Sequence, residues 1–133
     1  MARKKVITCS LPLNKNNSRM VLGLTTSGAE TLAARLRKAH LVSAFSSAPS
    51  EVLFSVFEKR KRKKRPDLVF CGDHKGAKKV AARLIRDVGF NPVDLGELSA
   101  ARYIEPFSLL LAEIAYDGSA GPQLTYRFQW LSR

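Results

Sequence analysis

Short apolar runs that favour β-strands alternate with helical segments along this chain, and this alternation restricts its fold more than any other feature. Turn residues bound four such runs, at residues 5–10, 40–45, 67–71 and 91–96. A segment with apolar residues at helical spacing follows each run. Helices between strands predict parallel neighbours, right-handed crossovers and helices on both faces of the sheet. We therefore expect an α/β domain with a mostly parallel sheet of about four strands.

Local signals predict where the helices begin and end. Ser27 and Glu30 form the pattern of a capping box before the first helix. The second helix is expected to run through a basic segment until Pro66 stops it. Gly89 fits the C-terminal cap of the third helix. Pro106 lies inside the last predicted helix and should kink or split it.

The chain has 133 residues and a formal net charge of +12, and apolar residues make up 45% of it. This length fits a single domain, residues 1–133, that ends in a loop and tail at 117–133, and the apolar content excludes a disordered polycation. Lys59–Arg65 supplies seven of the cations and residues 3–5 supply three, which first suggests an anionic partner. No apolar stretch is long enough to span a membrane, and we expect a cytoplasmic protein.

Few residues in this sequence carry recognisable chemistry. Cys9 and Cys71 lie far apart within predicted strands, and we expect two reduced, buried thiols. His40 and His74 are interpreted as solvated or capping residues. The sequence contains no C-x-x-C pair, glycine-rich phosphate loop or nucleophile elbow. We therefore predict no metal site and no catalytic residue.

Three acids lie at the ends of predicted elements, where capping is the simplest role: Asp73, Asp94 and Glu105. Asp73 in particular fits the N-cap of the third helix. In sheets of this kind, ligands bind at the carboxyl ends of the strands. A ligand site is therefore expected around residues 10–13, 45–47 and 71–74.

Six segments, in this order, resemble one protein family. They are K-V-I-T-C-S-L-P-L-N at 5–14, G-L-T-T-S-G-A-E at 23–30, A-F-S-S-A-P-S-E-V-L-F at 44–54, D-L-V-F-C-G-D at 67–73, A-A-R-L-I-R-D-V-G-F-N-P-V-D-L-G at 81–96 and A-R-Y-I-E-P-F at 101–107. They resemble the deazaflavin-dependent NADP oxidoreductases, which pass a hydride between NADP(H) and a deazaflavin coenzyme or a related acceptor. The resemblance covers only the later part of such a protein. It implies an incomplete dinucleotide-binding (Rossmann-like) fold whose glycine-rich first half is missing.

The resemblance also implies which residues would contact ligands. Four positions would face the cofactor: Leu11, Pro12, Phe45 and Ser46. Three would lie on the acceptor side: Thr25, Thr26 and Ser27. Leu11 and Ser46 depart from the family, which usually has asparagine at both positions. Because the phosphate loop and these amides are missing, the isolated chain is expected to bind NADPH feebly.

A sheet that lacks its neighbouring strand leaves Val6–Cys9 with an unpaired edge. We expect self-association, or association with a complementary N-terminal half, through this edge. Residues 124–128 are either a last strand or an arm onto a partner.

Two other interpretations stay open. One is a basic module that binds nucleic acid or another partner without catalysis. No aromatic residue interleaves Lys59–Arg65 and no nucleic-acid recognition motif is present, so a solvated helix end explains the run more simply. The other is a remnant of gene decay that has no selected function.

Overall fold

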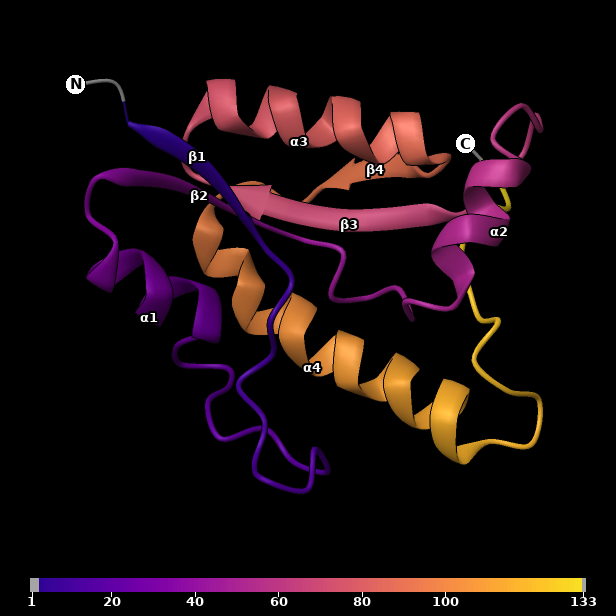
Figure 1. The fold of residues 1–133 in the computed structure, drawn as a ribbon, viewed down its shortest axis with the longest axis horizontal. Helices are drawn as coiled ribbons and strands as arrows, with labels where there is room; N and C mark the ends of the chain where they lie inside the picture. Colours follow the sequence, from indigo (N-terminus) through magenta and orange to yellow (C-terminus); the bar gives the residue numbers. More distant parts are fainter. Residues whose placement is uncertain (1–2, 133) are drawn as a thin grey trace.

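Four strands form one sheet in the order β1-β2-β3-β4, which is also their order in the chain. The computed structural model describes residues 3–132. The strands are β1 (Lys4–Thr8), β2 (Ala39–Ala44), β3 (Asp67–Gly72) and β4 (Asn91–Asp94), as Figure 1 shows. β1 pairs with β2 and β3 pairs with β4 in parallel, whereas β2 and β3 are antiparallel. The mostly parallel sheet of four strands is confirmed, but parallel neighbours do not extend to β2 and β3.

The antiparallel pair follows from the position of α2 (Val52–Glu58). This helix has seven residues, or about 10 Å of rise, and lies at one end of the sheet (Figure 1). A parallel neighbour needs a connection that returns to the start of the previous strand. Here the chain enters β3 near the end of β2, so that Ala44 pairs with Phe70 and Val42 pairs with Gly72.

The prediction that the second helix continues to Pro66 is wrong, because α2 ends at Glu58. Residues 59–66 form turns, bends and irregular backbone. Seven consecutive cations would place like charges three and four residues apart on a helix, where they repel. The basic run is therefore a loop and not the end of a helix.

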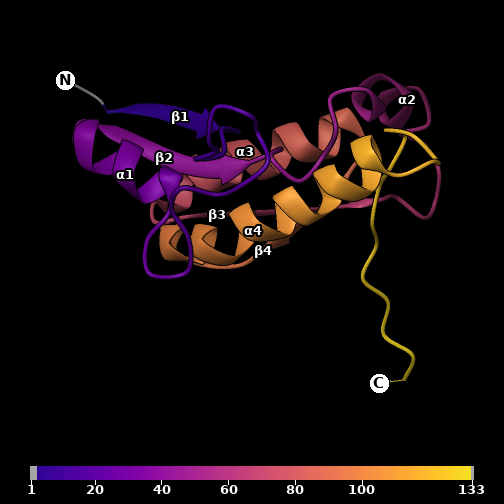
Figure 2. The same ribbon diagram turned by 90° about the horizontal axis from the view of Figure 1, so that it is seen from below.

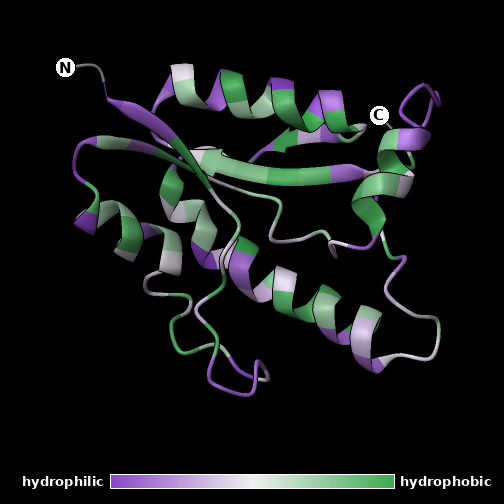
Figure 3. Ribbon diagram, viewed as in Figure 1, coloured by the Kyte–Doolittle hydropathy of each residue, from purple (hydrophilic) through white to green (hydrophobic). Residues whose placement is uncertain are grey.

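Helices cover both faces of the sheet, as expected. α3 (Lys75–Val88) lies on one face, and α1 (Gly28–Arg35) and α4 (Ala101–Ala112) lie on the other, α4 being preceded by the short 3-10 helix η1 (Leu98–Ala100) (Figure 1). Successive side chains of β2 and β3 alternate between two cores. The core beside α2 and α3 includes Val42, Leu68 and Phe70, and the core beside α1 and α4 includes Leu41, Val69 and Cys71. β3 is buried along its whole length and appears mostly hydrophobic in Figure 3.

The local helix signals are partly confirmed. Ser27 caps α1: its Oγ accepts from the Glu30 N–H and donates to the Glu30 carboxylate. Gly89 caps α3 with a φ of 123°. The expected split at Pro106 does not occur, since α4 runs unbroken to Ala112 and continues as the π-helical turn η2 (Glu113–Asp117). Burial of Ile104 and Ser108 on either side of the proline holds the helix together.

The C-terminal segment packs on the fold of its own chain. From residue 118 to residue 132 it forms bends, turns and then irregular backbone, with no further helix or strand (Figure 2). Tyr126 takes two backbone hydrogen bonds from β3: its carbonyl accepts from the Asp67 N–H at 2.8 Å, and its hydroxyl accepts from the Val69 N–H at 2.9 Å. The Tyr126 ring packs edge-to-face on Phe107, with 5.0 Å between centroids. Tyr126 thus completes the hydrogen bonding of β3 where β2 has already ended.

β1 is an edge strand of this sheet, with β2 as its pairing partner. Lys4 and Lys5 are exposed, and Val6 and Ile7 are half-buried. The segment that we expect to recruit a partner therefore lies at an edge, although Cys9 falls beyond the end of the strand. Within residues 3–132 no helix is both long and apolar enough to cross a membrane.

Candidate functional site

A pocket of about 430 Å³ lies where β1 and β2 end, against the later turns of α4. The sequence predicted a ligand site around residues 10–13, 45–47 and 71–74, and the pocket contains residues of the first two segments only. The prediction is wrong for residues 71–74, because β3 is antiparallel to β2 and its carboxyl end lies at the opposite end of the sheet. Its lining includes Leu11 and seven residues with polar side chains or a thiol: Cys9, Asn17, Ser46, Ser47, Ser50, Ser108 and Tyr116. Among the described residues that line it, none carries a charged side chain.

Two serines from distant elements form a hydroxyl pair in the pocket wall. The Oγ atoms of Ser46 and Ser108 lie 3.0 Å apart, and the Ser108 hydroxyl donates to the Ile104 carbonyl at 2.8 Å. A hydroxyl has one proton to donate, so Ser46 must be the donor to Ser108. Ser46 therefore keeps a free lone pair, and this wall presents an acceptor to a ligand that can donate.

Two tyrosines tie the loop after β2 to the C-terminal part of the chain. The Ser47 and Tyr126 hydroxyls lie 2.6 Å apart, and burial raises the pKa of Tyr126. The Tyr116 hydroxyl donates to the Glu51 carboxylate at 2.7 Å, a bond that lowers the pKa of Glu51 and raises that of Tyr116. These contacts hold the loop after β2, which carries Ser46 and Ser47, in one position beside the pocket.

Phe45 adopts a left-handed backbone conformation at the end of β2, with a φ of 70°. This region is uncommon for an aromatic residue and is sterically costly. The Phe45 ring packs edge-to-face on Phe90, with centroids 6.4 Å apart, whereas Ser46 lines the pocket. Costly backbone geometry of this kind is often found at functional sites.

The predicted cofactor-facing residues are only partly brought together. Leu11 and Ser46 both line the pocket. Phe45 packs against the core beside α2 and α3 and is not among the lining residues. Pro12 packs beside the start of α1, where its Cδ lies 3.2 Å from the position that a Cβ on Gly28 would take.

The predicted acceptor-side residues lie before α1 and do not line this pocket. Thr25 is exposed, and its N–H donates to the Gly23 carbonyl at 2.7 Å. Thr26 is half-buried. Ser27 is buried, and its hydroxyl both donates and accepts within the cap of α1. Their role in binding an acceptor stays a prediction.

A buried carboxylate in the middle of α4 caps α1. The Gly28 N–H donates to both Glu105 oxygens, at 2.5 and 3.0 Å. Burial raises the pKa of Glu105, while the backbone N–H groups of Gly28 and Ala29 act in the opposite direction. Arg102 of α4 pairs with Glu30 of α1 at 2.8 Å, beside the contact between Glu105 and Gly28. The Arg102 guanidinium lowers the pKa of Glu30. The capping role of Glu105 is confirmed, but the helix it caps is not its own.

The cysteines and the residues before α3 occupy structural positions. Two predictions about them are wrong: the burial of Cys9 and the N-cap role of Asp73. Cys71 is buried, and burial raises the pKa of its thiol to about 12, but Cys9 is exposed because β1 ends at Thr8. The N-cap of α3 is His74, whose Nδ1 accepts from Ala77 N–H at 3.1 Å. Asp73 instead accepts from the N–H of Leu98, the first residue of η1.

No group of three or more potential metal ligands occurs within the described part of the chain. His40 and His74 stack on each other with ring centroids 3.6 Å apart. Asp94 pairs with Lys78 at 2.9 Å and accepts from the Gly96 N–H. Ser108 and Tyr116 are among the pocket residues that the sequence did not predict. Helical periodicity marks Ser108 only as a member of a mostly apolar helix, and no local signal pairs it with Ser46.

Solved structures share this fold. A crystal structure of a candidate F420-dependent NADP reductase from Arthrobacter sp. FB24 superposes with a TM-score of 0.80 at 16% identity, over 93% of this chain and 56% of that one. A crystal structure of the hypothetical protein SMa0349 from Sinorhizobium meliloti gives a TM-score of 0.56 at 25% identity, over 76% of this chain and 50% of that one. No protein-family profile matches the sequence. The likeness establishes a Rossmann-like α/β fold, and this chain spans about half the length of each of these proteins.

Proposed function

We propose that this chain contributes one half of a site for hydride transfer between NADP(H) and a deazaflavin or related acceptor. The observation that carries the proposal is the uncharged pocket at the ends of β1 and β2, lined by Leu11 and Ser46, within a Rossmann-like fold. The glycine-rich half of the nucleotide site would lie outside these 133 residues, in the same protein or in a partner.

The pocket suits the nicotinamide end of the cofactor and not its phosphates. Its volume of about 430 Å³ is in the range of small-ligand sites, and its wall is apolar and hydroxyl-bearing. Pyrophosphate binding needs backbone amides at a helix N-terminus or cationic side chains, and none of the described lining residues is a cation. When bound, NADP(H) supplies or accepts the hydride itself.

Residues of this chain would then position the nicotinamide ring. Leu11 offers an apolar surface, and the free lone pair of Ser46 can accept from a carboxamide N–H. No general acid or base is needed for this step, because hydride transfer depends on the alignment of donor and acceptor. The left-handed conformation of Phe45 places Ser46 at the pocket wall.

The edge of β1 is the surface through which we propose that the missing half, or a second copy, completes the sheet. Its outer backbone groups have no strand beside them within residues 3–132. Two exposed lysines begin this strand, whereas the half-buried Val6 and Ile7 sit where a neighbouring strand would cover them. Size-exclusion chromatography with light scattering tests this part: a clean monomer at micromolar concentration would contradict self-association.

Fluorescence titration with NADPH tests the binding half of the proposal. The wild-type chain alone should bind feebly, and the Leu11→Asn, Ser46→Asn double variant should bind more tightly because both amides return to the pocket wall. Ser50→Asn, an exposed position that also lines the pocket, is the matched control. Sub-micromolar binding by the unmodified chain would contradict the need for a second half. Equal NADPH affinities in wild type, the double variant and the control would show that positions 11 and 46 do not contribute to cofactor binding.

A further inference from the structure

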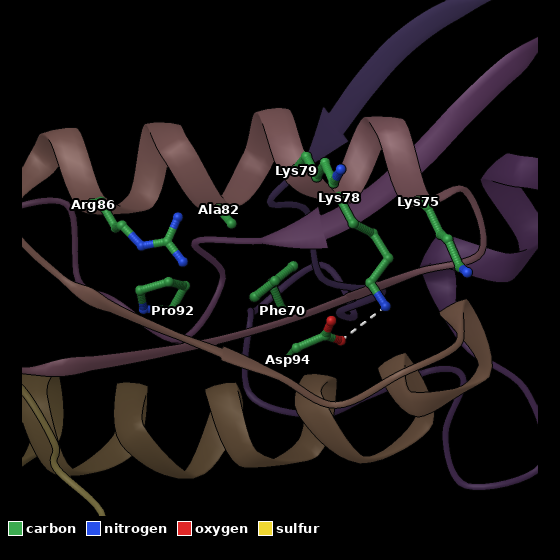
Figure 4. A pocket seen from close by; sticks show the side chains of 8 residues that line it. All are labelled: Phe70, Lys75, Lys78, Lys79, Ala82, Arg86, Pro92 and Asp94. Carbon is green, nitrogen blue, oxygen red and sulfur yellow. Dashed lines mark ion pairs between the residues drawn. The ribbon is translucent and has the colours of Figure 1, made fainter.

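A second groove, of about 390 Å³, runs along α3 on the face of the sheet that α3 covers. Its floor is apolar and is formed by Phe70, Ala82 and Pro92. Cations from one side of α3 surround it: Lys75, Lys78, Lys79 and Arg86. Figure 4 shows these side chains along the helix, with Asp94 as the one acid drawn among them.

Most of this positive charge is not neutralised by the protein. Lys78 pairs with Asp94 at 2.9 Å and also donates to the Gly96 carbonyl at 3.0 Å. Within residues 3–132, Lys75, Lys79 and Arg86 have no ion-pair partner. Three exposed cations beside one apolar floor therefore hold counterions that a polyanion could release.

The basic loop extends this groove past the C-terminal end of α3. Arg65 donates to the carbonyls of Arg86 at 2.9 Å and Arg60 at 2.5 Å, which fastens the loop to the helix end. The Arg60 guanidinium lies 4.1 Å from the centre of the Phe57 ring. A further hollow of about 510 Å³ is lined by Glu58 and the first four cations of the loop. Residues 58–65 and 75–94 together hold 12 of the 23 Lys and Arg side chains and three of the 11 acids.

We propose that this groove and loop form a binding surface for the sugar–phosphate backbone of single-stranded nucleic acid. From Lys75 to Arg86 the helix rises about 16 Å, which spans several phosphates of an extended strand before the loop continues the track. The apolar floor can take the face of a base, a feature that a bare polyphosphate would not use.

A single strand fits this geometry better than a duplex or a membrane does. A helix that reads duplex DNA projects into the groove of the nucleic acid. Here, the cations border an open hollow between α3 and β4, so a ligand that reaches both the cations and the apolar floor has to follow this hollow (Figure 4). A thin, flexible chain can do so, whereas a flat lipid surface would reach only the outermost lysines.

The test is fluorescence anisotropy with a labelled oligothymidylate of about 20 nucleotides, titrated at several salt concentrations. The groove variant replaces three exposed cations with glutamine: Lys75→Gln, Lys79→Gln and Arg86→Gln. The loop variant replaces Lys61, Arg62, Lys63 and Lys64 with alanine. The matched control, Arg35→Gln, Arg37→Gln and Lys38→Gln, removes the same charge as the groove variant from exposed positions in and just after α1, on the opposite face of the sheet.

We expect the groove and loop variants each to lose about tenfold or more in affinity, and the control to lose less than about twofold. Removing three phosphate contacts should also reduce the slope of log affinity against log salt by about 2. A charge-preserving variant, Lys75→Arg, Lys79→Arg and Arg86→Lys, should bind like wild type, which separates loss of charge from loss of folding.

Three outcomes would overturn the proposal. Equal losses in the groove and control variants would mean that net charge alone attracts the oligonucleotide. Competition by a duplex of the same length at equal or lower phosphate concentration would exclude a single-strand site. Vesicles that contain phosphatidylserine, if they bind wild type but not the groove variant and displace the oligonucleotide, would assign the surface to membranes. None of these outcomes bears on the pocket at the ends of β1 and β2.

Discussion

Glu105, in the middle of α4, accepts the N–H of Gly28, the first residue of α1, on both of its carboxylate oxygens, at 2.5 and 3.0 Å. The carboxylate is buried, with 1% of its surface exposed. It therefore joins two helices through residues that are 77 positions apart in the sequence, at the point where the positive end of the α1 dipole needs an anion.

Replacing this carboxylate should cost substantial stability. Glu105→Ala should lower the free energy of unfolding by about 2–4 kcal/mol, because it leaves the Gly28 N–H unpaired and opens a cavity. Glu105→Gln keeps an acceptor and should cost about 1–2 kcal/mol. Urea denaturation measures both, with Glu113→Ala, an exposed acid directly after α4, as control. A loss in Glu105→Ala no larger than that of the control would show that the helix junction does not depend on this carboxylate.

The end of α3 tolerates only glycine at position 89. Its φ is 123°, and a Cβ there would lie 2.6 Å from the Val56 carbonyl oxygen of α2. Gly89→Ala should therefore lower the free energy of unfolding by about 2–4 kcal/mol. Gly96→Ala is the control, since its φ of 99° is also positive but nothing lies within 4 Å of the added methyl group. It should lose only about 1 kcal/mol, and equal losses at the two positions would argue against a clash at Gly89.

The Tyr126 hydroxyl should contribute to the stability of the fold beyond the packing of its ring. Tyr126→Phe removes the acceptor of the Val69 N–H and the partner of the Ser47 hydroxyl. We expect a loss of about 1–3 kcal/mol in the free energy of unfolding, because a strand N–H is left without a partner. Hydrogen exchange at Val69 should accelerate in this variant and not in Phe128→Leu. Unchanged protection of the Val69 amide would contradict the hydrogen bond.

The two thiols should differ in reactivity with alkylating agents. Cys9 is exposed beside the pocket, whereas Cys71 is buried and its pKa is raised to about 12. Iodoacetamide at mildly alkaline pH should modify one thiol per native chain, at Cys9, and both after unfolding. Mass spectrometry of the peptides gives the result, and Cys9→Ser is the control that should leave the native chain unlabelled. Labelling of Cys71 in the native chain would contradict its burial.

Stability should fall as the pH drops below the ordinary pKa of histidine. Burial, the stacked His74 ring and the nearby Arg3 and Lys5 lower the pKa of His40 from 6.5. The unfolded chain then binds a proton more readily than the folded chain, so stability is present above pH 6.5 and is lost as the pH falls toward the lowered pKa. His40→Phe keeps a ring against His74 and should flatten this part of the profile. Urea denaturation between about pH 5 and 8 measures the difference, and parallel profiles would exclude His40 as the cause.

Local patterns predicted the parts of this fold that depend on nearby residues. The Ser27–Glu30 cap, the glycine at the end of α3 and the alternation of strands and helices follow from spacing alone. The direction of β3 does not, because it depends on α2 lying at one end of the sheet. Cys9 was misplaced because its apolar run extends past Thr8, where the strand ends.

The candidate site was predictable only in part. Leu11 and Ser46 follow the two strands that lead to it, so their positions could be expected from the sequence. Ser108 and Tyr116 reach the same pocket from α4 and η2, which lie more than 60 residues further along the chain. Long-range packing of this kind leaves no periodic or local mark in the sequence.

The contact between Tyr126 and β3 has a consequence for the order of events during synthesis. Every helix and strand of the fold is made before residue 126 leaves the ribosome. Until then the N–H groups of Asp67 and Val69 lack the partners that Tyr126 provides, and the Phe107 ring lacks its aromatic cover. A nascent chain in which β1 to β4 have already paired therefore still exposes an apolar patch and an incompletely bonded inner strand until Tyr126 joins them, and this interval favours aggregation.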